Sequence, residues 1–191
     1  MPSTREQLLG AGRRLIEEGG YGAASVLAIT AHAGLAAGTL YRHFRSKEEL
    51  FVEVFRSVCD RELEAMRRAA GDDGVSHSEQ LQMVVCTFAE RALRRPRLAW
   101  ALLAEPVDPM VDAERLAYRA RYAELIAGCL QAGVRAGELP DQDSALTAAA
   151  LVGACAEALV GPLSRRDDGV PVADLIQSLR TFARRAIGAG R

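Results

Sequence analysis

Residues 33–50 read AGLAAGTLYRHFRSKEEL, and this stretch decides the fold of the N-terminal part of the chain. Gly34 closes an apolar run that begins after Ser25, a residue type that caps helices, so we predict a short helix over 26–33 and then a turn. Leu35 begins another short helix, of about seven residues. Two short helices around a glycine turn flanked by small residues are typical of a helix-turn-helix, although an ordinary αα-hairpin has the same signature.

A longer helix precedes this pair. Ser3 and Glu6 have the spacing of a capping box, and Gly19-Gly20 is a stop signal. Between them, apolar positions recur with helical spacing at Leu8, Ala11, Gly12, Leu15 and Ile16. In the next helix we expect Ile29, Ala33 and either Val26 or Leu27 to face inward. Residues 1–46 are therefore predicted to form a three-helix domain that contains the candidate helix-turn-helix.

These residues together resemble the DNA-binding head of the TetR family of one-component bacterial regulators. The most specific part is G-T-L-Y-x-H-F-x-S-K-x-x-L over residues 38–50, preceded by Gly20-Tyr21, Ile29 and Ala33-Gly34-Leu35. The resemblance covers residues 4–51 and implies a third helix that enters the major groove of operator DNA. Two positions depart from the family pattern: Ala36 lacks the usual capping hydroxyl, and Thr30 replaces an alanine. Both departures predict a head that is loosely set without DNA.

Several side chains around the third helix suit contacts with DNA. Hydroxyl and cationic groups bind phosphates, a role that fits Thr39, Tyr41, His43 and Lys47, although Tyr41 also fits a core. Leu40 and Phe44 are better interpreted as core. The resemblance places base contacts at Ala36, Ala37, Gly38 and Arg42, and we add Ser25 to the DNA-binding set. Arg42 suits a guanine edge or a phosphate.

Composition and charge agree with a helical protein that has one basic end. The 191 residues are 49% hydrophobic, 26% charged and only 5% aromatic, with 34 alanines, which favours an all-α fold and excludes disorder. Residues 1–47 carry six basic and three acidic side chains, whereas residues 48–191 carry 18 and 22. A basic head on an acidic body indicates a polyanionic partner at one end.

No pattern in the sequence indicates an enzyme, a metal or a membrane. The three histidines fit no catalytic or metal-binding motif, and there is no phosphate-binding glycine loop. We interpret Cys59, Cys86, Cys129 and Cys155 as reduced core thiols. An apolar run of about 18 residues and a signal peptide are both absent. We therefore expect no catalysis, cofactor or membrane partner, and a cytoplasmic location.

Residues 47–191 are predicted to form a helical effector-binding and dimerisation domain. Periodicity and capping signals place its helices at about 47–70, 77–95, 96–104, 111–136, 143–161 and 172–188, with a polar loop over 164–169. The third of these ranges begins at Pro96, and Ser76 with Glu79 repeats the capping-box spacing before the second.

The predicted helix over 111–136 brings Arg115 onto the same face as Tyr118 and Tyr122. A charge on an apolar face needs a partner. One interpretation is a salt bridge to a carboxylate of the body, such as Glu105 or Glu90, or a guanidinium that reaches the edge of the core. The other is the polar end of an effector pocket, with an effector that is mostly apolar and has an anionic or hydrogen-bonding end. The remaining candidate pocket residues, of types that more often form plain core, are Phe88, Trp100, Leu103 and Met110.

Residues 145–160 are apolar almost all round, with Glu157 as the only charge, so this helix must be covered on every side. Together with the last helix it suits a twofold four-helix interface, and the resemblance also implies a homodimer. A core helix within one chain is the alternative. The predicted interface residues are Ala149, Val152, Gly153, Ala156, Leu175, Leu179 and Phe182.

The sequence thus predicts a ligand-responsive DNA-binding transcriptional regulator, a repressor released from its operator by a small molecule. The alternative is a helical DNA-binding or adaptor protein without an effector. Binding to one operator that a small molecule reverses would separate the two.

Overall fold

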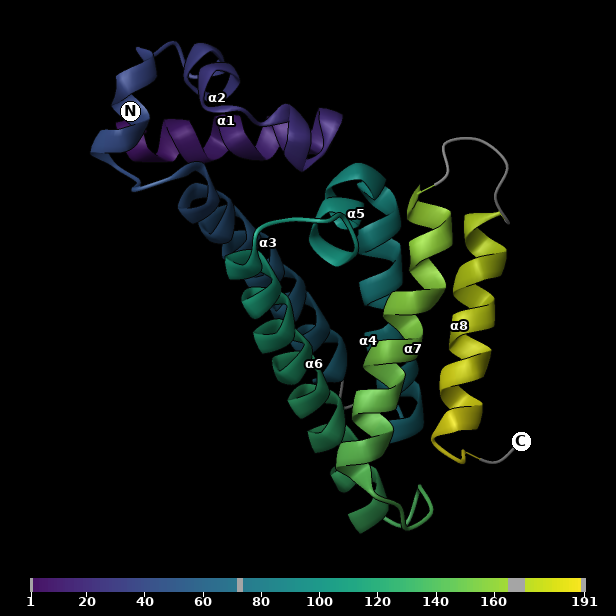
Figure 1. Ribbon diagram of the computed structural model, residues 1–191. Coiled ribbons are helices and arrows are strands. Elements are labelled where there is room, and N and C mark those ends of the chain that lie inside the picture. The colour runs from purple at the N-terminus through teal and green to yellow at the C-terminus, as the bar shows by residue number, and fades with distance from the viewer. Residues whose placement is uncertain (1, 72–73, 165–170, 190–191) are drawn as a thin grey trace. The chain divides into compact units, whose positions relative to one another are not determined.

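The computed structural model describes residues 2–71, 74–164 and 171–189, and every regular element within these ranges is helical (Figure 1). The predicted all-α fold is therefore confirmed. Most of the predicted 164–169 loop lies outside the described residues. In chain order the elements are α1 (Thr4–Gly19), η1 (Tyr21–Ala23), α2 (Val26–His32), η2 (Ala37–Arg42), α3 (Lys47–Ala70), α4 (His77–Arg94), α5 (Pro96–Leu103), α6 (Pro109–Arg135), α7 (Ser144–Ser164) and α8 (Val172–Ala186).

The chain forms two compact units. The first contains Met1–Cys59 and Arg95–Leu116, and the second contains Asp60–Arg94 and Ala117–Arg191. Helices α3 and α6 each begin in the first unit and end in the second. The first unit therefore combines the predicted DNA-binding helices with α5 and the start of α6.

Helix α1 begins at the predicted capping box. The Glu6 carboxylate accepts the Ser3 backbone N–H at 2.7 Å, and the Ser3 hydroxyl accepts the Glu6 N–H at 3.3 Å. Leu8 and Ile16 are completely buried. The helix ends at Gly20, whose φ of 81° is a conformation that favours glycine.

Helix α2 is capped by Ser25, whose hydroxyl accepts the Ala28 N–H at 3.1 Å. Ile29 lies in the core as expected, while Leu27 is 72% exposed, so Val26 is the inward member of that pair. Thr30 is buried, and its hydroxyl donates to the Val26 carbonyl at 2.9 Å, so the β-branched residue brings no unsatisfied polar group. Gly34 makes the predicted turn with φ 69°.

The short helix predicted after Leu35 is a 3₁₀ helix, η2, instead of an α-helix. Its bonds include Thr39 N–H to the Ala36 carbonyl at 2.9 Å and His43 N–H to the Leu40 carbonyl at 3.0 Å. Ala36 has no side-chain acceptor, and no side chain caps the helix. Tight i to i+3 bonds are a usual way to satisfy the free groups at short or uncapped helix ends. Leu40 and Phe44 are buried as predicted.

In the second unit, α4, α7 and α8 pack side by side (Figure 1). The second predicted capping box is present, because Ser76 and Glu79 exchange hydrogen bonds of 3.0 and 3.3 Å. Arg180 on α8 donates to the Gln82 side chain on α4 at 3.2 Å. Helix α7 is long and apolar enough to cross a membrane by length and composition alone, and one third of its most apolar window is buried.

Candidate DNA-binding and effector-binding sites

Helix η2 presents a row of solvent-accessible side chains. Tyr41 is 60% exposed and is not part of the core. Thr39 is half-buried. The other predicted DNA-binding residues of this segment are exposed, and they are Ala36, Ala37, Gly38, Arg42 and His43. The buried side chains of Leu40 and Phe44 anchor η2 in the core of the head. The exposed side chains of η2 therefore point to solvent.

Lys47 begins α3, and its position depends on Tyr21. The Lys47 Nζ lies 3.9 Å from the centroid of the Tyr21 ring, a cation–π contact. The Tyr21 hydroxyl donates to the Glu48 carboxylate at 3.2 Å, and its ring packs edge-on against Phe51 at 4.5 Å. Burial and the nearby Glu48 carboxylate raise the pKa of Tyr21. Tyr21 therefore orders the start of α3, a role that its sequence position next to Gly20 did not indicate.

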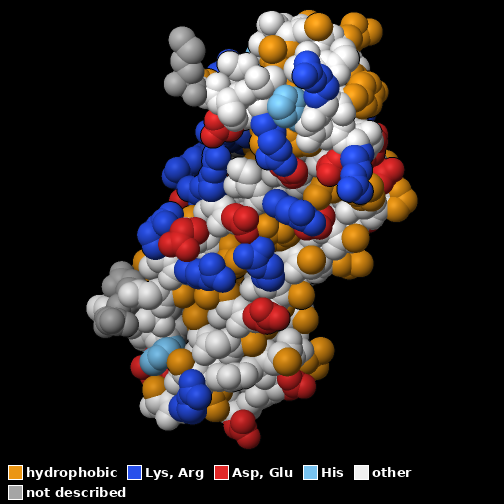
Figure 2. Space-filling model, turned by 90° about the vertical axis from the view of Figure 1, so that its left-hand side faces the viewer, with side chains coloured by type: hydrophobic (Ala, Val, Ile, Leu, Met, Phe, Trp, Pro, Cys, Tyr) orange, Lys and Arg blue, Asp and Glu red, His pale blue; other side chains and the backbone are white. Residues whose placement is uncertain are grey.

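Positive charge on the face in Figure 2 is not gathered into one continuous patch, because Lys and Arg side chains alternate with Asp and Glu. In the head, Arg5 has an acidic partner. Its guanidinium lies 4.9 Å from the Phe44 ring centroid and also pairs with the Glu53 carboxylate. Arg5 is therefore paired within the head, whereas Arg42 is exposed on η2.

The candidate effector residues are divided between the two units. Trp100, Leu103, Met110 and Arg115 belong to the first unit, and Phe88, Tyr118 and Tyr122 belong to the second. In the first unit, Met110 is exposed, whereas Trp100 and Leu103 are half-buried. Each group has its own surroundings.

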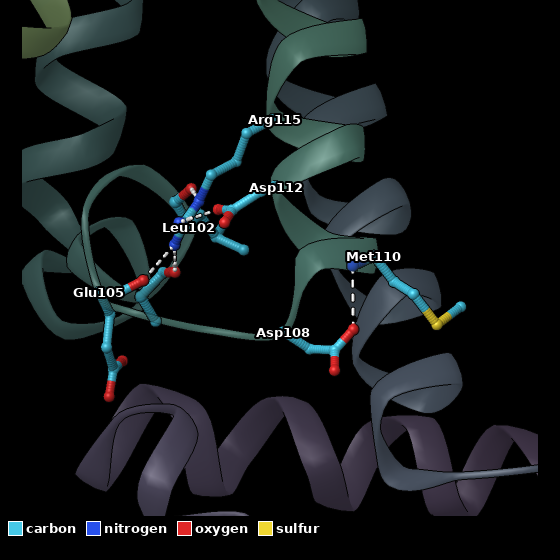
Figure 3. Close-up of polar contacts among 7 residues, drawn as sticks. Leu102, Glu105, Asp108, Met110, Asp112 and Arg115 are labelled. Carbon is cyan, nitrogen blue, oxygen red and sulfur yellow. Dashed lines mark hydrogen bonds and ion pairs between the residues drawn. The ribbon is translucent and has the colours of Figure 1, made fainter.

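Arg115 fastens the C-terminal end of α5 (Figure 3). Its Nη2 donates to the carbonyls of Ala101 at 2.8 Å and Glu105 at 2.6 Å, and its Nε donates to the Leu102 carbonyl at 2.8 Å. The Nη1 atom of the same guanidinium pairs with the Asp112 carboxylate at 2.7 Å. The expected salt bridge to a carboxylate of the body is present, and the partner is Asp112, not the Glu105 or Glu90 carboxylate given as an example. The cause is the three free carbonyls at the end of α5, which a planar guanidinium fits well.

The aromatic candidates of the second unit form one cluster. The Tyr122 ring centroid lies 5.8 Å from Phe88 and 6.2 Å from Tyr118. The Tyr118 hydroxyl donates to Asp60 at 2.7 Å, and Arg121 donates to the same oxygen at 2.9 Å. Burial, together with the Asp60 carboxylate, raises the pKa of Tyr118 to about 12. This cluster joins α3, α4 and α6 within the unit.

The predicted interface residues differ in their burial. Ala149, Gly153 and Phe182 are exposed, and Val152 and Leu175 are half-buried. Ala156 and Leu179 are buried within the chain itself. The first three residues are therefore accessible on the surface, whereas the last two pack against helices of the same chain.

Cys59 and Cys155 are buried, and Cys86 and Cys129 are half-buried, so the predicted core thiols lie in the core or at its edge. Burial raises the pKa of Cys155 to about 11, so this thiol is a poor nucleophile at neutral pH. Within the described ranges, no group of three His, Cys, Asp or Glu side chains is placed to hold a metal ion.

A capped head with an exposed short helix after a glycine turn, continued by a helical body, defines a class: the helix-turn-helix regulators. Comparison with known proteins gives the family. Residues 8–54 match the bacterial regulatory proteins of the tetR family, and residues 74–159 match the tetracyclin repressor-like C-terminal domain. The chain belongs to the TetR family of DNA-binding transcriptional regulators, which are not enzymes.

Individual relatives agree with this assignment. The HTH-type transcriptional repressor KstR2 of Rhodococcus jostii is 33% identical over 137 residues, which are 70% of this chain and 66% of that protein. UidR of Escherichia coli, an HTH-type transcriptional regulator, is 27% identical over 78% of this chain and 76% of its own. The structure of FadR from Bacillus subtilis in complex with stearoyl-CoA has a TM-score of 0.81 at 22% identity and covers 95% of this chain and 98% of FadR.

Proposed function

We propose that the chain is a cytoplasmic homodimeric repressor that binds operator DNA and is released from it by a small molecule. Residues 1–46 would bind the operator, and residues 47–191 would bind the effector and the second subunit. The observation that carries this proposal is the exposed row on η2, held in place by Leu40 and Phe44. Ser25 supports the same surface by capping α2.

The homodimer is supported by apolar surface on the last two helices. Leu146 on α7 is 67% exposed, and Val172 and Phe182 on α8 are also exposed. At Gly153, a built Cβ meets nothing within 4 Å, so this position of α7 is open. Such surface on neighbouring helices is typical of a subunit interface. This contact also accounts for the apolar character of α7 without a membrane.

For the effector we propose a long-chain acyl thioester of coenzyme A, which has an apolar acyl chain and an anionic end formed by the coenzyme A phosphates. The support is the likeness to FadR, whose structure holds stearoyl-CoA, and to the fatty acid metabolism regulator of Bacillus subtilis at 23% identity. Trp100, Leu103 and Met110, which belong to the first unit, remain the proposed contacts of its apolar part.

The anionic end has two candidate arginines. Arg115 is only 14% exposed, and its guanidinium already donates to three carbonyls and one carboxylate. Arg97 on α5 has a buried Nε that finds no hydrogen-bond partner in the described part of the chain. An unsatisfied buried donor costs free energy that an anionic ligand group would recover. We therefore propose that Arg97, more than Arg115, contacts the anionic end.

Stearoyl-CoA is the probe for this proposal, tested on the full chain bound to a labelled operator. We expect release of the wild-type protein, and Arg97→Ala should raise the concentration for half-release about tenfold with unchanged operator affinity. Arg94→Ala, which removes an exposed arginine paired with Glu90, is the matched control. If neither stearoyl-CoA nor shorter acyl thioesters weaken operator binding, the effector class is wrong and the regulator without an effector is favoured.

A further inference from the structure

Inside the first unit, helix α5 is joined to α1 at its start and to the turn after α1 beyond its end. At its start, Arg95 pairs with Glu17 on α1 at 3.0 Å. Beyond its end, the Glu105 carboxylate accepts the backbone N–H of Tyr21 at 2.9 Å, a bond between residues 84 positions apart. Figure 3 shows the Glu105 side chain directed away from Arg115 and toward the α1 ribbon. The short helix α5 is thus held against the DNA-binding head by one contact near each end.

The contact at Tyr21 is built closely on both sides. A Cβ added at Gly20 would lie 3.0 Å from both Glu105 carboxylate oxygens, which is tighter than an ordinary contact, so the glycine leaves room for the carboxylate at this turn. On the other side, the backbone of Glu105 is held by the Arg115 guanidinium at 2.6 Å. Arg115 in the first turns of α6 thus holds the backbone of Glu105. The Glu105 carboxylate in its turn holds the Gly20–Tyr21 segment that follows α1.

Tyr21 passes this constraint on to the start of α3. Its ring lies under the Lys47 ammonium and beside Phe51, and its hydroxyl donates to Glu48. A shift of the Gly20–Tyr21 turn would move the support of Lys47, one of the proposed phosphate contacts. The order of contacts is Arg115 on α6, the backbone and carboxylate of Glu105, the Tyr21 backbone, and then the Tyr21 ring with Lys47.

We propose that Glu105 is a positioning residue for DNA binding, a latch through which movement of α6 and the end of α5 reaches the head. The latch holds the head in its operator-binding position, and an effector that displaces the start of α6 withdraws it. The second statement rests on the proposed function, whereas the first does not need an effector.

Two substitutions separate the reach of the side chain from its charge. Glu105→Gln keeps an oxygen at the position that accepts the Tyr21 N–H but removes the charge. Glu105→Asp keeps the charge but is one methylene too short. Asp108→Asn is the matched control, because it removes a neighbouring carboxylate charge and keeps the side-chain oxygen that caps the Met110 N–H at 2.9 Å.

The first measurement uses the full chain without effector, with amide hydrogen exchange at Tyr21 and operator affinity as readouts. We expect Glu105→Asp to speed exchange at Tyr21 and to weaken operator binding, each on the order of tenfold, since a hydrogen bond to a carboxylate is lost. Glu105→Gln and Asp108→Asn should stay near wild type. The latch is disproved if Glu105→Asp leaves both readouts unchanged, or if Asp108→Asn changes them equally.

The second measurement is the ratio of operator dissociation constants with and without saturating stearoyl-CoA. We expect Glu105→Asp to bring this ratio several-fold closer to one, because the head no longer follows α6. A merely structural role would weaken binding with an unchanged ratio, and that result would refute the coupling. If stearoyl-CoA has no effect on the wild type, the proposed effector class fails, and the latch is judged on exchange and affinity alone.

Discussion

At the scale of single residues, the head contains two kinds of cationic side chain: some are held by neighbouring groups, and others project into solvent. The Lys47 ammonium is held over the Tyr21 ring. The Arg42 side chain is exposed on η2. A held point charge suits a phosphate, whose position repeats along DNA, and a long free guanidinium can reach a base edge. We therefore assign positioning to Lys47 and sequence reading to Arg42.

Substituting the two residues tests this assignment. Lys47→Ala should weaken binding to all duplexes alike and reduce the slope of log affinity against log salt concentration by about one per subunit. Arg42→Ala should instead lose about 1–3 kcal/mol of preference at one base pair in each half-site. Affinities for a set of singly substituted operators at several salt concentrations give both quantities. Equal weakening of every duplex by Arg42→Ala would make Arg42 a phosphate contact.

The Tyr118 hydroxyl gives a pH dependence that can be measured in the second unit. Its folded pKa of about 12 lies above the ordinary value of 10.0, because of burial and the bond to Asp60. The protonated phenol therefore stabilises the fold fully below pH 10.0, and this contribution is lost as the pH rises toward 12. Urea unfolding across this range should show a smaller loss of stability for Tyr118→Phe than for wild type. Identical pH profiles would contradict this account.

At the scale of elements, the sequence predicted most helices because their signals are local. The capping boxes at Ser3 and Ser76 and the φ-positive Gly34 are recognisable without knowledge of the rest of the chain. The 3₁₀ form of η2 was not predicted, although the missing cap at Ala36 was noted. The Glu105–Tyr21 bond could not be predicted, since it joins residues 84 positions apart and depends on how α5 packs on α1.

The uncapped η2 leads to a prediction for the third helix of the head. Ala36→Ser adds a side-chain acceptor at a residue with extended backbone (φ −68°, ψ 146°), the conformation of a helix N-cap. We expect a gain in unfolding free energy of about 0.5–2 kcal/mol, measured by urea denaturation. Ala37→Ser, one residue later, is the matched control and should gain nothing. A destabilised Ala36→Ser variant would mean that η2 cannot accept a cap.

At the scale of the whole molecule, the proposed dimer would bring two heads to one operator, and two heads make more phosphate contacts than one. The proposed interface lies on the exposed sides of α7 and α8. Ala156 was a predicted interface residue, but it is buried within the chain, so a charge there would disturb the fold itself. Gly153 and Phe182 are the better positions for a test.

Gly153→Arg should give folded monomers. The position is open in the single chain, so the arginine costs little within the subunit but clashes in a close-packed seam. Sedimentation velocity should show half the wild-type mass, with an unchanged circular dichroism spectrum and much weaker operator binding. Gly10→Arg, also open but on α1, is a control for the added charge. A variant that stays dimeric would place the interface elsewhere.

The central claim is that the chain binds one operator sequence as a twofold dimer, and the most direct test is selection of binding sites from random duplex DNA by the full chain. We predict an inverted repeat with half-site centres about one helical turn apart or somewhat more. The selected duplex should bind at least about 10³-fold more tightly than a scrambled duplex at physiological salt. Equal affinity for the selected and scrambled duplexes, or a selected site without twofold symmetry, would contradict the account.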